Sequence, residues 1–222
     1  MTIVGVMPAA GYALRLQPLE RSKEMLEVGG RPVMDYVAER MRAGGAEVLR
    51  VVTRPEKEDV AANAERLGAT VVLARPATIN LSFVAGLGGL KPDDVALLGF
   101  PDSLWEPADG YQKLVDAVEA GSEVALGLFE APGLQSDYIR LDAEGGIEEI
   151  EIKPACPPSD WIWGAAAARV RALEGLERRE WPSQHMNALL QEGRPVAAVR
   201  LSNAYLDIGT RASLALADAW NR

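Results

Sequence analysis

The sequence predicts an α/β fold with three layers, in which helices cover both faces of a mostly parallel, mixed sheet. Three observations lead to this expectation. Apolar strand patterns alternate with amphipathic helix patterns over the first 130 residues. The strands among them are apolar almost throughout, which is typical of strands buried on both faces. After about residue 131 the pattern becomes richer in strands, which predicts an added β-rich section over one end of the sheet.

In the first half of the chain, each expected element supports the prediction of a parallel sheet. Pro32 suits the first turn of a helix, while Gly44, Gly45 and Gly68 suit helix ends. Each helical pattern separates two apolar runs, as crossover connections require. The expected strands are 2–7, 48–53, 70–75, 95–100 and 123–130, and the expected helices are 32–46, 56–69, 81–90 and 108–120.

The second half justifies the β-rich section. DYIRLD and IEEIEIKP alternate around the turn AEGG, which predicts a β-hairpin. Further strands are expected near 161–168 and at 195–201, with helices near 169–176, 183–192 and 210–220. We interpret residues 1–222 as a single domain, divided into a parallel part (1–131) and a β-rich part with a closing helix (132–222).

Composition narrows the classes of function. The formal net charge of −9 argues against a nucleic-acid surface, and no apolar run approaches the ~20 residues of a membrane span. The start of the chain has no basic segment before its apolar run, so no signal peptide is expected. A single cysteine, Cys156, fits a reducing cytoplasm. With only one histidine, His185, any metal is expected to be a hard cation on carboxylates.

The stretch PAAGYALR (8–15) leaves the first strand at its carboxyl end, where open α/β sheets bind ligands. Ala9, Ala10 and Gly11 have little or no side chain, so their backbone N–H groups can approach a phosphate. Arg15 offers bidentate hydrogen bonds to phosphate oxygens, and Lys23 offers a mobile charge. The alternative is a tight turn followed by two solvated cations. A dinucleotide site is not favoured, because GxGxxG is absent.

The segment AAGYALRLQPLERSKEMLEVGGRP resembles the opening signature of nucleotidyltransferases that make activated sugars, especially sugar-1-phosphate uridylyl- and thymidylyltransferases. The resemblance implies the Rossmann-like nucleotide-diphospho-sugar transferase fold, with residues 1–131 binding nucleotide and 132–222 binding the acceptor. It implies nucleotide contacts from Ala9, Ala10, Gly11, Tyr12 and Ala13 and catalytic roles for Arg15 and Lys23. Three departures occur: Ala13 replaces the second glycine, Glu20 replaces Thr, and Ser22 replaces Pro.

Two aspartates match the metal ligands of that family. Asp102, in LLGFPDS, follows an apolar strand, and Asp207 lies in the segment YLDIGT, which resembles the family's last signature. The resemblance implies that both bind Mg²⁺ and that Asp102 is catalytic. Each aspartate has an alternative role, since Asp is common at turns and helix starts. Thr210 is expected to be an N-cap on either interpretation.

Weaker matches point to the acceptor and to the base. Lys153, in IKP, matches the lysine that holds the sugar phosphate, but Ile152 replaces the usual glutamate. Glu151 is a substitute candidate, although strand alternation places it on the other face. Gly164 matches a glycine in the family's acceptor strand. Asn80 and Ser82 lie where related enzymes approach the base, with helix capping as the alternative role.

The resemblance implies a Mg²⁺-dependent enzyme that moves a nucleoside monophosphate from a nucleoside triphosphate to a sugar 1-phosphate and releases pyrophosphate. Two alternatives remain. The first is the same chemistry on a non-sugar acceptor, such as an alditol phosphate, an aminoalkyl phosphate or a cofactor precursor. Ile152 favours it, and so does the spacer from Arg15 to Lys23, which is shorter than in the family's opening signature. The second is a non-catalytic nucleotide-binding homologue. The expected partners are small molecules, with no nucleic acid or membrane; a homo-oligomer is an open option.

Overall fold

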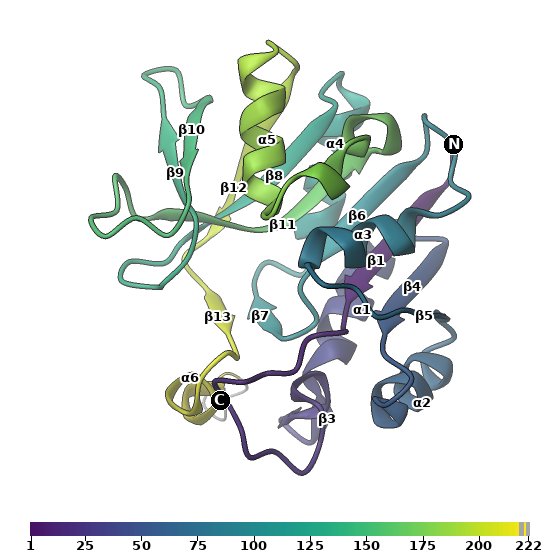
Figure 1. Ribbon diagram of the computed structural model, residues 1–222. Helices are drawn as coiled ribbons and strands as arrows, with labels where there is room; N and C mark the ends of the chain where they lie inside the picture. Colours follow the sequence, from purple (N-terminus) through teal and green to yellow (C-terminus); the bar gives the residue numbers. More distant parts are fainter. Residues whose placement is uncertain (218–219, 221–222) are drawn as a thin grey trace.

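The computed structural model describes residues 1–217 and 220 (Figure 1). Among these residues, the main sheet has nine strands. Seven of them follow the order β5-β4-β1-β6-β11-β8-β12, and the hairpin β9–β10 joins the end of β11. The strands are β1 (Ile3–Pro8), β4 (Val48–Thr53), β5 (Thr70–Leu73), β6 (Val95–Gly99), β8 (Val124–Glu130), β9 (Tyr138–Leu141), β10 (Ile147–Glu151), β11 (Trp161–Arg169) and β12 (Val196–Ser202).

The sheet is mixed around a parallel portion. Strands β6, β1, β4 and β5 run parallel, and β12 runs parallel to β8. Strand β11 is antiparallel to both β6 and β8. The strands of the second half therefore continue the sheet of the first half, and only the β9–β10 hairpin projects from it (Figure 1).

Helices cover both faces of this sheet. One face packs against α1 (Val33–Ala43), α2 (Glu58–Arg66) and α4 (Gly110–Glu119), and the other against α3 (Ile79–Leu87) and α5 (Pro182–Gln191). Strand β6 shows the alternation that makes this possible: Val95 and Leu97 point to the first face, while Ala96 and Leu98 point to the second. The predicted three-layer α/β/α fold is confirmed.

Short elements lie at the carboxyl edge of the parallel strands. They are η1 (Lys23–Met25), β2 (Glu27–Val28), β3 (Arg31–Pro32), β7 (Ser103–Trp105), β13 (Tyr205–Asp207) and α6 (Arg211–Ala217). None of the four strands among them was expected from the sequence, because strands of two or three residues carry no clear periodicity. Arg211 donates to the carbonyl of Pro18 at 3.4 Å, so α6 lies beside the segment that follows β1.

One expected helix is wrong. Residues 169–176 form two 3₁₀ turns, η2 (Val170–Leu173) and η3 (Leu176–Arg178), in place of an α-helix. Gly175 separates them with a left-handed φ of 85°, which an α-helix cannot contain. The closing helix was expected over 210–220; α6 covers its first part, and residues 218, 219, 221 and 222 lie outside the described residues.

No helix in the described part of the chain is both long enough and apolar enough to span a membrane.

Candidate active site

A cleft of about 470 Å³ opens at the carboxyl ends of β1 and β6. This is where a parallel sheet presents the loops that follow its strands. The cleft brings together five candidates from distant parts of the sequence. They are Arg15, Lys23, Asp102, Lys153 and Asp207.

The loop that follows β1 borders a smaller hollow beside this cleft, which Ala10, Gly11 and Tyr12 line together with Ser82. Ala9 and Ala10 are buried, whereas Gly11 and Tyr12 are exposed. A Cβ atom added to Gly11 would meet no protein atom within 4 Å. The protein itself therefore leaves open space at Gly11, and a ligand can approach the backbone there.

Ala13 has a left-handed backbone, with a φ of 52°. This conformation explains why a glycine is usual at the matching position of the resembling family, since glycine adopts it without steric strain. Ala13 therefore adopts a backbone conformation that glycine adopts more readily.

Lys23 and Asp102 form an ion pair in the cleft, between Nζ and Oδ2. Burial alone would lower the pKa of Lys23, but the negative charges of Asp102, Glu24 and Asp207 outweigh burial and raise that pKa above its ordinary value. Lys23 therefore stays protonated at neutral pH. Asp102 itself is 6% exposed, and it follows the fully buried strand β6.

Two backbone contacts bring Asp207 next to Asp102. Strand β13 pairs antiparallel with β7, with Asp207 opposite Ser103, and the N–H of Ile208 donates to the carbonyl of Asp102 at 2.9 Å. Burial and the negative charge of Asp102 raise the pKa of Asp207 to about 6, although Lys23 and Arg15 oppose this rise. Two neighbouring carboxylates that repel each other are suited to a hard divalent cation, which binds oxygen ligands and retains several waters.

These two aspartates fit Mg²⁺ as a pair. Among the described residues, no group of three or more His, Cys, Asp or Glu side chains forms a self-sufficient metal site. Mg²⁺ in nucleotide enzymes needs only one or two carboxylates, because phosphates and waters complete its shell. Asp102 and Asp207 are the residues that would hold it.

Arg15 reaches the same place from the loop after β1. A Cβ atom added to Gly209 would lie 2.9 Å from Nη2 of Arg15 and 2.5 Å from Oδ2 of Asp207. Gly209 therefore makes room for the guanidinium beside the carboxylate. Thr210, which follows, accepts a hydrogen bond from the N–H of Ser213 at 3.1 Å, so its predicted role as an N-cap is confirmed.

Lys153 lines the cleft from the segment that follows β10. Its backbone is left-handed, with a φ of 43°, and its Nζ lies 3.7 Å from the centre of the Trp181 ring. Trp163 and Asp137 also line this end of the cleft. Trp163 donates to Ser183 at 2.9 Å, and Ser183 donates to Asp137 at 2.5 Å, which fixes these side chains. The acceptor candidate thus lies in a partly aromatic environment.

Asn80, Glu151 and Gly164 line neither the cleft nor the smaller hollow. Asn80 is fully buried, and its amide donates to the carbonyls of Leu176 at 3.1 Å and Arg179 at 2.7 Å. Glu151 pairs with Arg140 on the neighbouring strand β9. Gly164 contributes space, since a Cβ atom there would lie 2.3 Å from the ring of Tyr205, which does line the cleft.

Ser82 borders the smaller hollow, and its hydroxyl donates to the carbonyl of Thr78 at 3.3 Å. This bond occupies the hydroxyl donor within the first turn of α3. Ser82 is 4% exposed.

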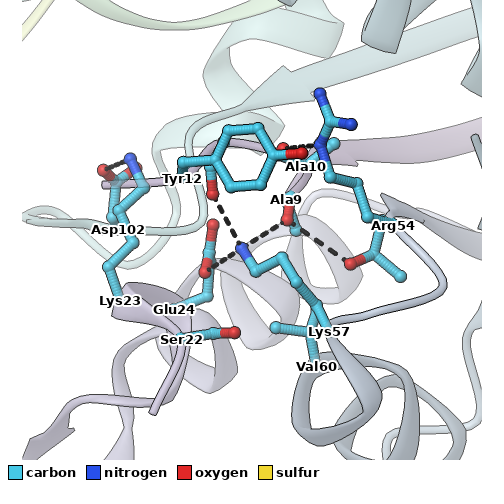
Figure 2. Close-up of polar contacts among 12 residues, drawn as sticks. Ala9, Ala10, Tyr12, Ser22, Lys23, Glu24, Arg54, Lys57, Val60 and Asp102 are labelled. Carbon is cyan, nitrogen blue, oxygen red and sulfur yellow. Dashed lines mark hydrogen bonds and ion pairs between the residues drawn. The ribbon is translucent and has the colours of Figure 1, made fainter. Parts of the chain in front are cut away.

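Sequence reasoning missed several residues around the loop. Arg54 and Lys57 follow β4 and contact the carbonyls of residues 9–11, and Glu24 pairs with Lys57 (Figure 2). The available signal was their place just after an apolar strand. Ser22, a departure from the family signature, donates through its N–H and its hydroxyl to Asp59, at 2.7 and 2.8 Å.

The chain matches a protein family over most of its length. Residues 5–197 match the MobA-like NTP transferase domain. The chain therefore belongs to the MobA-like NTP transferase family, a family of nucleotidyltransferases. The sequence-based resemblance to nucleotidyltransferases is confirmed at this level.

Two solved structures share the fold. A protein from Bacillus anthracis, assigned as a glucose-1-phosphate thymidylyltransferase and crystallised with sucrose, has a TM-score of 0.87 and 17% identity, with 98% of this chain and 94% of that chain covered. A UDP-glucose pyrophosphorylase from Acinetobacter baumannii has a TM-score of 0.82 and 19% identity, with coverages of 98% and 92%. At these identities the likeness concerns the fold.

Proposed function

We propose that this nucleotidyltransferase moves a nucleoside monophosphate from a nucleoside triphosphate to a sugar 1-phosphate, depends on Mg²⁺, and releases pyrophosphate. The observation that carries the proposal is the meeting of three cations, Arg15, Lys23 and Lys153, with the carboxylates of Asp102 and Asp207 in one cleft. Cations that can bind two phosphates, in one cleft with a pair of carboxylates that can hold a divalent cation, suit the joining of two phosphates.

The reaction follows from these groups. An oxygen of the acceptor phosphate attacks the α-phosphorus, and the bond from that phosphorus to the bridging oxygen of the β-phosphate breaks. Arg15 and Lys23 stabilise the charge that develops on pyrophosphate, and Lys153 holds the acceptor phosphate. Bound Mg²⁺, held by Asp102 and Asp207, supplies charge neutralisation at the α-phosphate region. No protein nucleophile is needed, because positioning and electrostatics supply the catalysis.

Lys23 has two partners in this scheme. In the structure its ammonium binds Asp102, the carboxylate assigned to the cation. When the substrate binds, we expect Lys23 to leave Asp102 for the phosphates, so that each charge keeps an opposite partner. The high pKa of Lys23 keeps the ammonium protonated throughout.

A second acceptor class has its own support. The ammonium of Lys153 already lies over the Trp181 ring, so this aromatic face accepts a cation. The family's usual glutamate for sugar hydroxyls is Ile152 here. An aminoalkyl phosphate is therefore the main alternative to a sugar 1-phosphate.

A screen of pyrophosphate release tests both acceptors. Common nucleoside triphosphates are crossed with sugar 1-phosphates, alditol phosphates and phosphocholine, with Mg²⁺ or with EDTA. We expect release that requires one triphosphate and one acceptor together and stops in EDTA. Release from triphosphate alone, with no acceptor requirement, would contradict the proposal.

Asp102→Asn tests the metal assignment. We expect turnover to fall by at least about 100-fold, since even residues behind metal ligands are worth about 10- to 100-fold. Circular dichroism checks that the fold is retained. Turnover equal to that of the unmodified enzyme would refute the assignment.

Lys153→Ala tests the placement of the acceptor. Loss of a charge-assisted hydrogen bond, worth about 1.5–3 kcal/mol, is expected to raise the KM for the acceptor by about 10- to 100-fold. The KM for the triphosphate is expected to change little. Lys91→Ala, at an exposed lysine that does not line the cleft, is the control. If Lys153→Ala weakened only the triphosphate, the acceptor site would be misplaced.

A further inference from the structure

Two cations hold three successive carbonyl groups of the loop after β1 (Figure 2). Nζ of Lys57 donates to the carbonyl of Ala9 at 2.6 Å and to that of Gly11 at 3.2 Å. Nε of Arg54 donates to the carbonyl of Ala10 at 2.8 Å. Each carbonyl from Ala9 to Gly11 therefore accepts a hydrogen bond from a side chain in the segment between β4 and α2.

Fixing a carbonyl also fixes the next N–H group. The peptide bonds that join residues 9 to 12 are trans, so each N–H there points opposite to the carbonyl of the residue before it. Each of the N–H groups of Ala10, Gly11 and Tyr12 therefore points away from the cation that holds the carbonyl before it. In the described part of the chain, these three N–H groups have no hydrogen-bond acceptor. Successive free N–H groups in such an arrangement bind anions.

Lys57 forms an ion pair with a buried carboxylate, that of Glu24. Its Nζ lies 2.6 Å from Oε2 of Glu24, whose residue has no exposed surface, while the Lys57 side chain is 11% exposed. Oε1 of Glu24 is buried and has no partner among the described residues. A buried ion pair is poor at stabilising a fold, because desolvation opposes the attraction. The position of the Lys57–Glu24 pair next to the loop therefore needs an explanation other than stability.

The pair also joins two parts of the cleft. Glu24 follows Lys23 in η1, and Lys57 directly precedes helix α2. Lys57 therefore contacts both the loop that follows β1 and, through Glu24, the segment that carries Lys23. Neither Lys57 nor Glu24 lines the cleft, so neither is placed to touch a substrate there.

We infer that Lys57 is a positioning residue for nucleotidyl transfer: with Arg54, it orients the loop N–H groups of residues 10–12 to bind the triphosphate. The inference rests on the proposed function, because it takes the triphosphate to bind at this loop. Glu24 keeps the Lys57 ammonium in place and transmits the same constraint to Lys23.

The test measures the affinity for inorganic tripolyphosphate by calorimetry, because this probe lacks base and sugar. Lys57→Met keeps the length of the side chain but removes all of its donors. We expect its Kd to rise by about tenfold or more, the effect of losing about 1.4 kcal/mol. Lys57→Arg retains donors and is expected to restore the Kd to within about threefold of the unmodified enzyme. Lys113→Met, at an exposed lysine that pairs with Asp109, is the matched control.

Several results separate positioning from a merely structural role. Folded Lys57→Met with an unchanged Kd would overturn the inference, and so would Lys57→Arg that binds as weakly as Lys57→Met. If Lys57→Met does not fold, Arg54→Met replaces it, because this half-buried arginine also anchors the loop; an unchanged Kd there would equally overturn the inference.

Measurements on the unmodified enzyme distinguish failure of the proposed function from failure of the inference about Lys57. If it binds no tripolyphosphate and transfers no nucleotide, the proposed function fails and the inference fails with it. If it binds tripolyphosphate and transfers nucleotide, but Lys57→Met does both equally well, only the inference about Lys57 fails.

Discussion

At the scale of single residues, two departures from the family signature, Ala13 and Ser22, have local explanations. Ala13 occupies a left-handed position, where a glycine would be free of strain. Ser22 uses its N–H to bind Asp59, and a proline has no N–H to donate. Neither change removes a charged group from the cleft. Ala13 and Ser22 thus leave the charged residues of the cleft in place.

Ala13→Gly is expected to stabilise the protein. A left-handed conformation costs an L-residue about 1–2 kcal/mol, and the greater freedom of glycine in the unfolded chain offsets part of this gain. We expect the free energy of unfolding in urea to rise by about 0.5–1 kcal/mol. Ala120→Gly, at a residue with a right-handed backbone, is the control and should lower it. A loss of stability in Ala13→Gly would contradict the left-handed backbone of Ala13.

At the scale of elements, the cleft depends on contacts between segments far apart in sequence. Strand β13 places Asp207 beside Asp102, and Asp59 at the start of α2 anchors the segment before Lys23. The family motifs identified Asp102 and Asp207. The sequence did not reveal the residues behind them, because Asp59 and Lys57 lie in an ordinary charged helix start.

The Asp59 contact is expected to make stability depend on pH. Burial raises the pKa of Asp59, but the hydrogen bonds from Ser22 and from the N–H of Val60 outweigh burial and leave the pKa below its ordinary value. A carboxylate with a lowered pKa contributes stability above its unfolded pKa of about 3.8, and the contribution is lost as the pH falls through the folded value.

Urea unfolding of Asp59→Asn at several pH values measures this contribution. The variant should be less stable than the unmodified protein between about pH 5 and 8, and the difference should shrink below about pH 4. Glu65→Gln, an exposed change on the same helix, is the control and should show no such trend. A difference that stays constant down to pH 3 would exclude Asp59 as the cause.

At the scale of the whole molecule, the two halves share one sheet. Strand β11 pairs with β6 through residues 165–169, and β6 has almost no exposed surface. The division at residue 131 that the sequence indicated therefore crosses a continuous sheet. The proposed acceptor end and the proposed triphosphate end of the cleft therefore adjoin strands of one continuous sheet.

A fragment of residues 1–131 is expected to be unfolded. Without β11, the strand β6 becomes an edge, and the apolar residues of β8 lose their partners on both sides. Far-ultraviolet circular dichroism and amide dispersion in NMR spectra measure this, and the full chain should unfold in a single calorimetric transition. A folded, dispersed fragment would mean that the parallel half is a separate domain.

The sequence alone determined the alternating α/β order, the three-layer fold and five of the charged residues that line the cleft. Local periodicity and ordered motifs carry that information, because each depends on residues close together in the chain. The tertiary structure decided which residues stand behind the loop. Pro8 pairs with Val52 across β1 and β4, and this register alone brings Arg54 and Lys57 to carbonyls more than 40 residues away. Charged side chains after a strand look alike in sequence, and only the pairing of strands gives each one its partner.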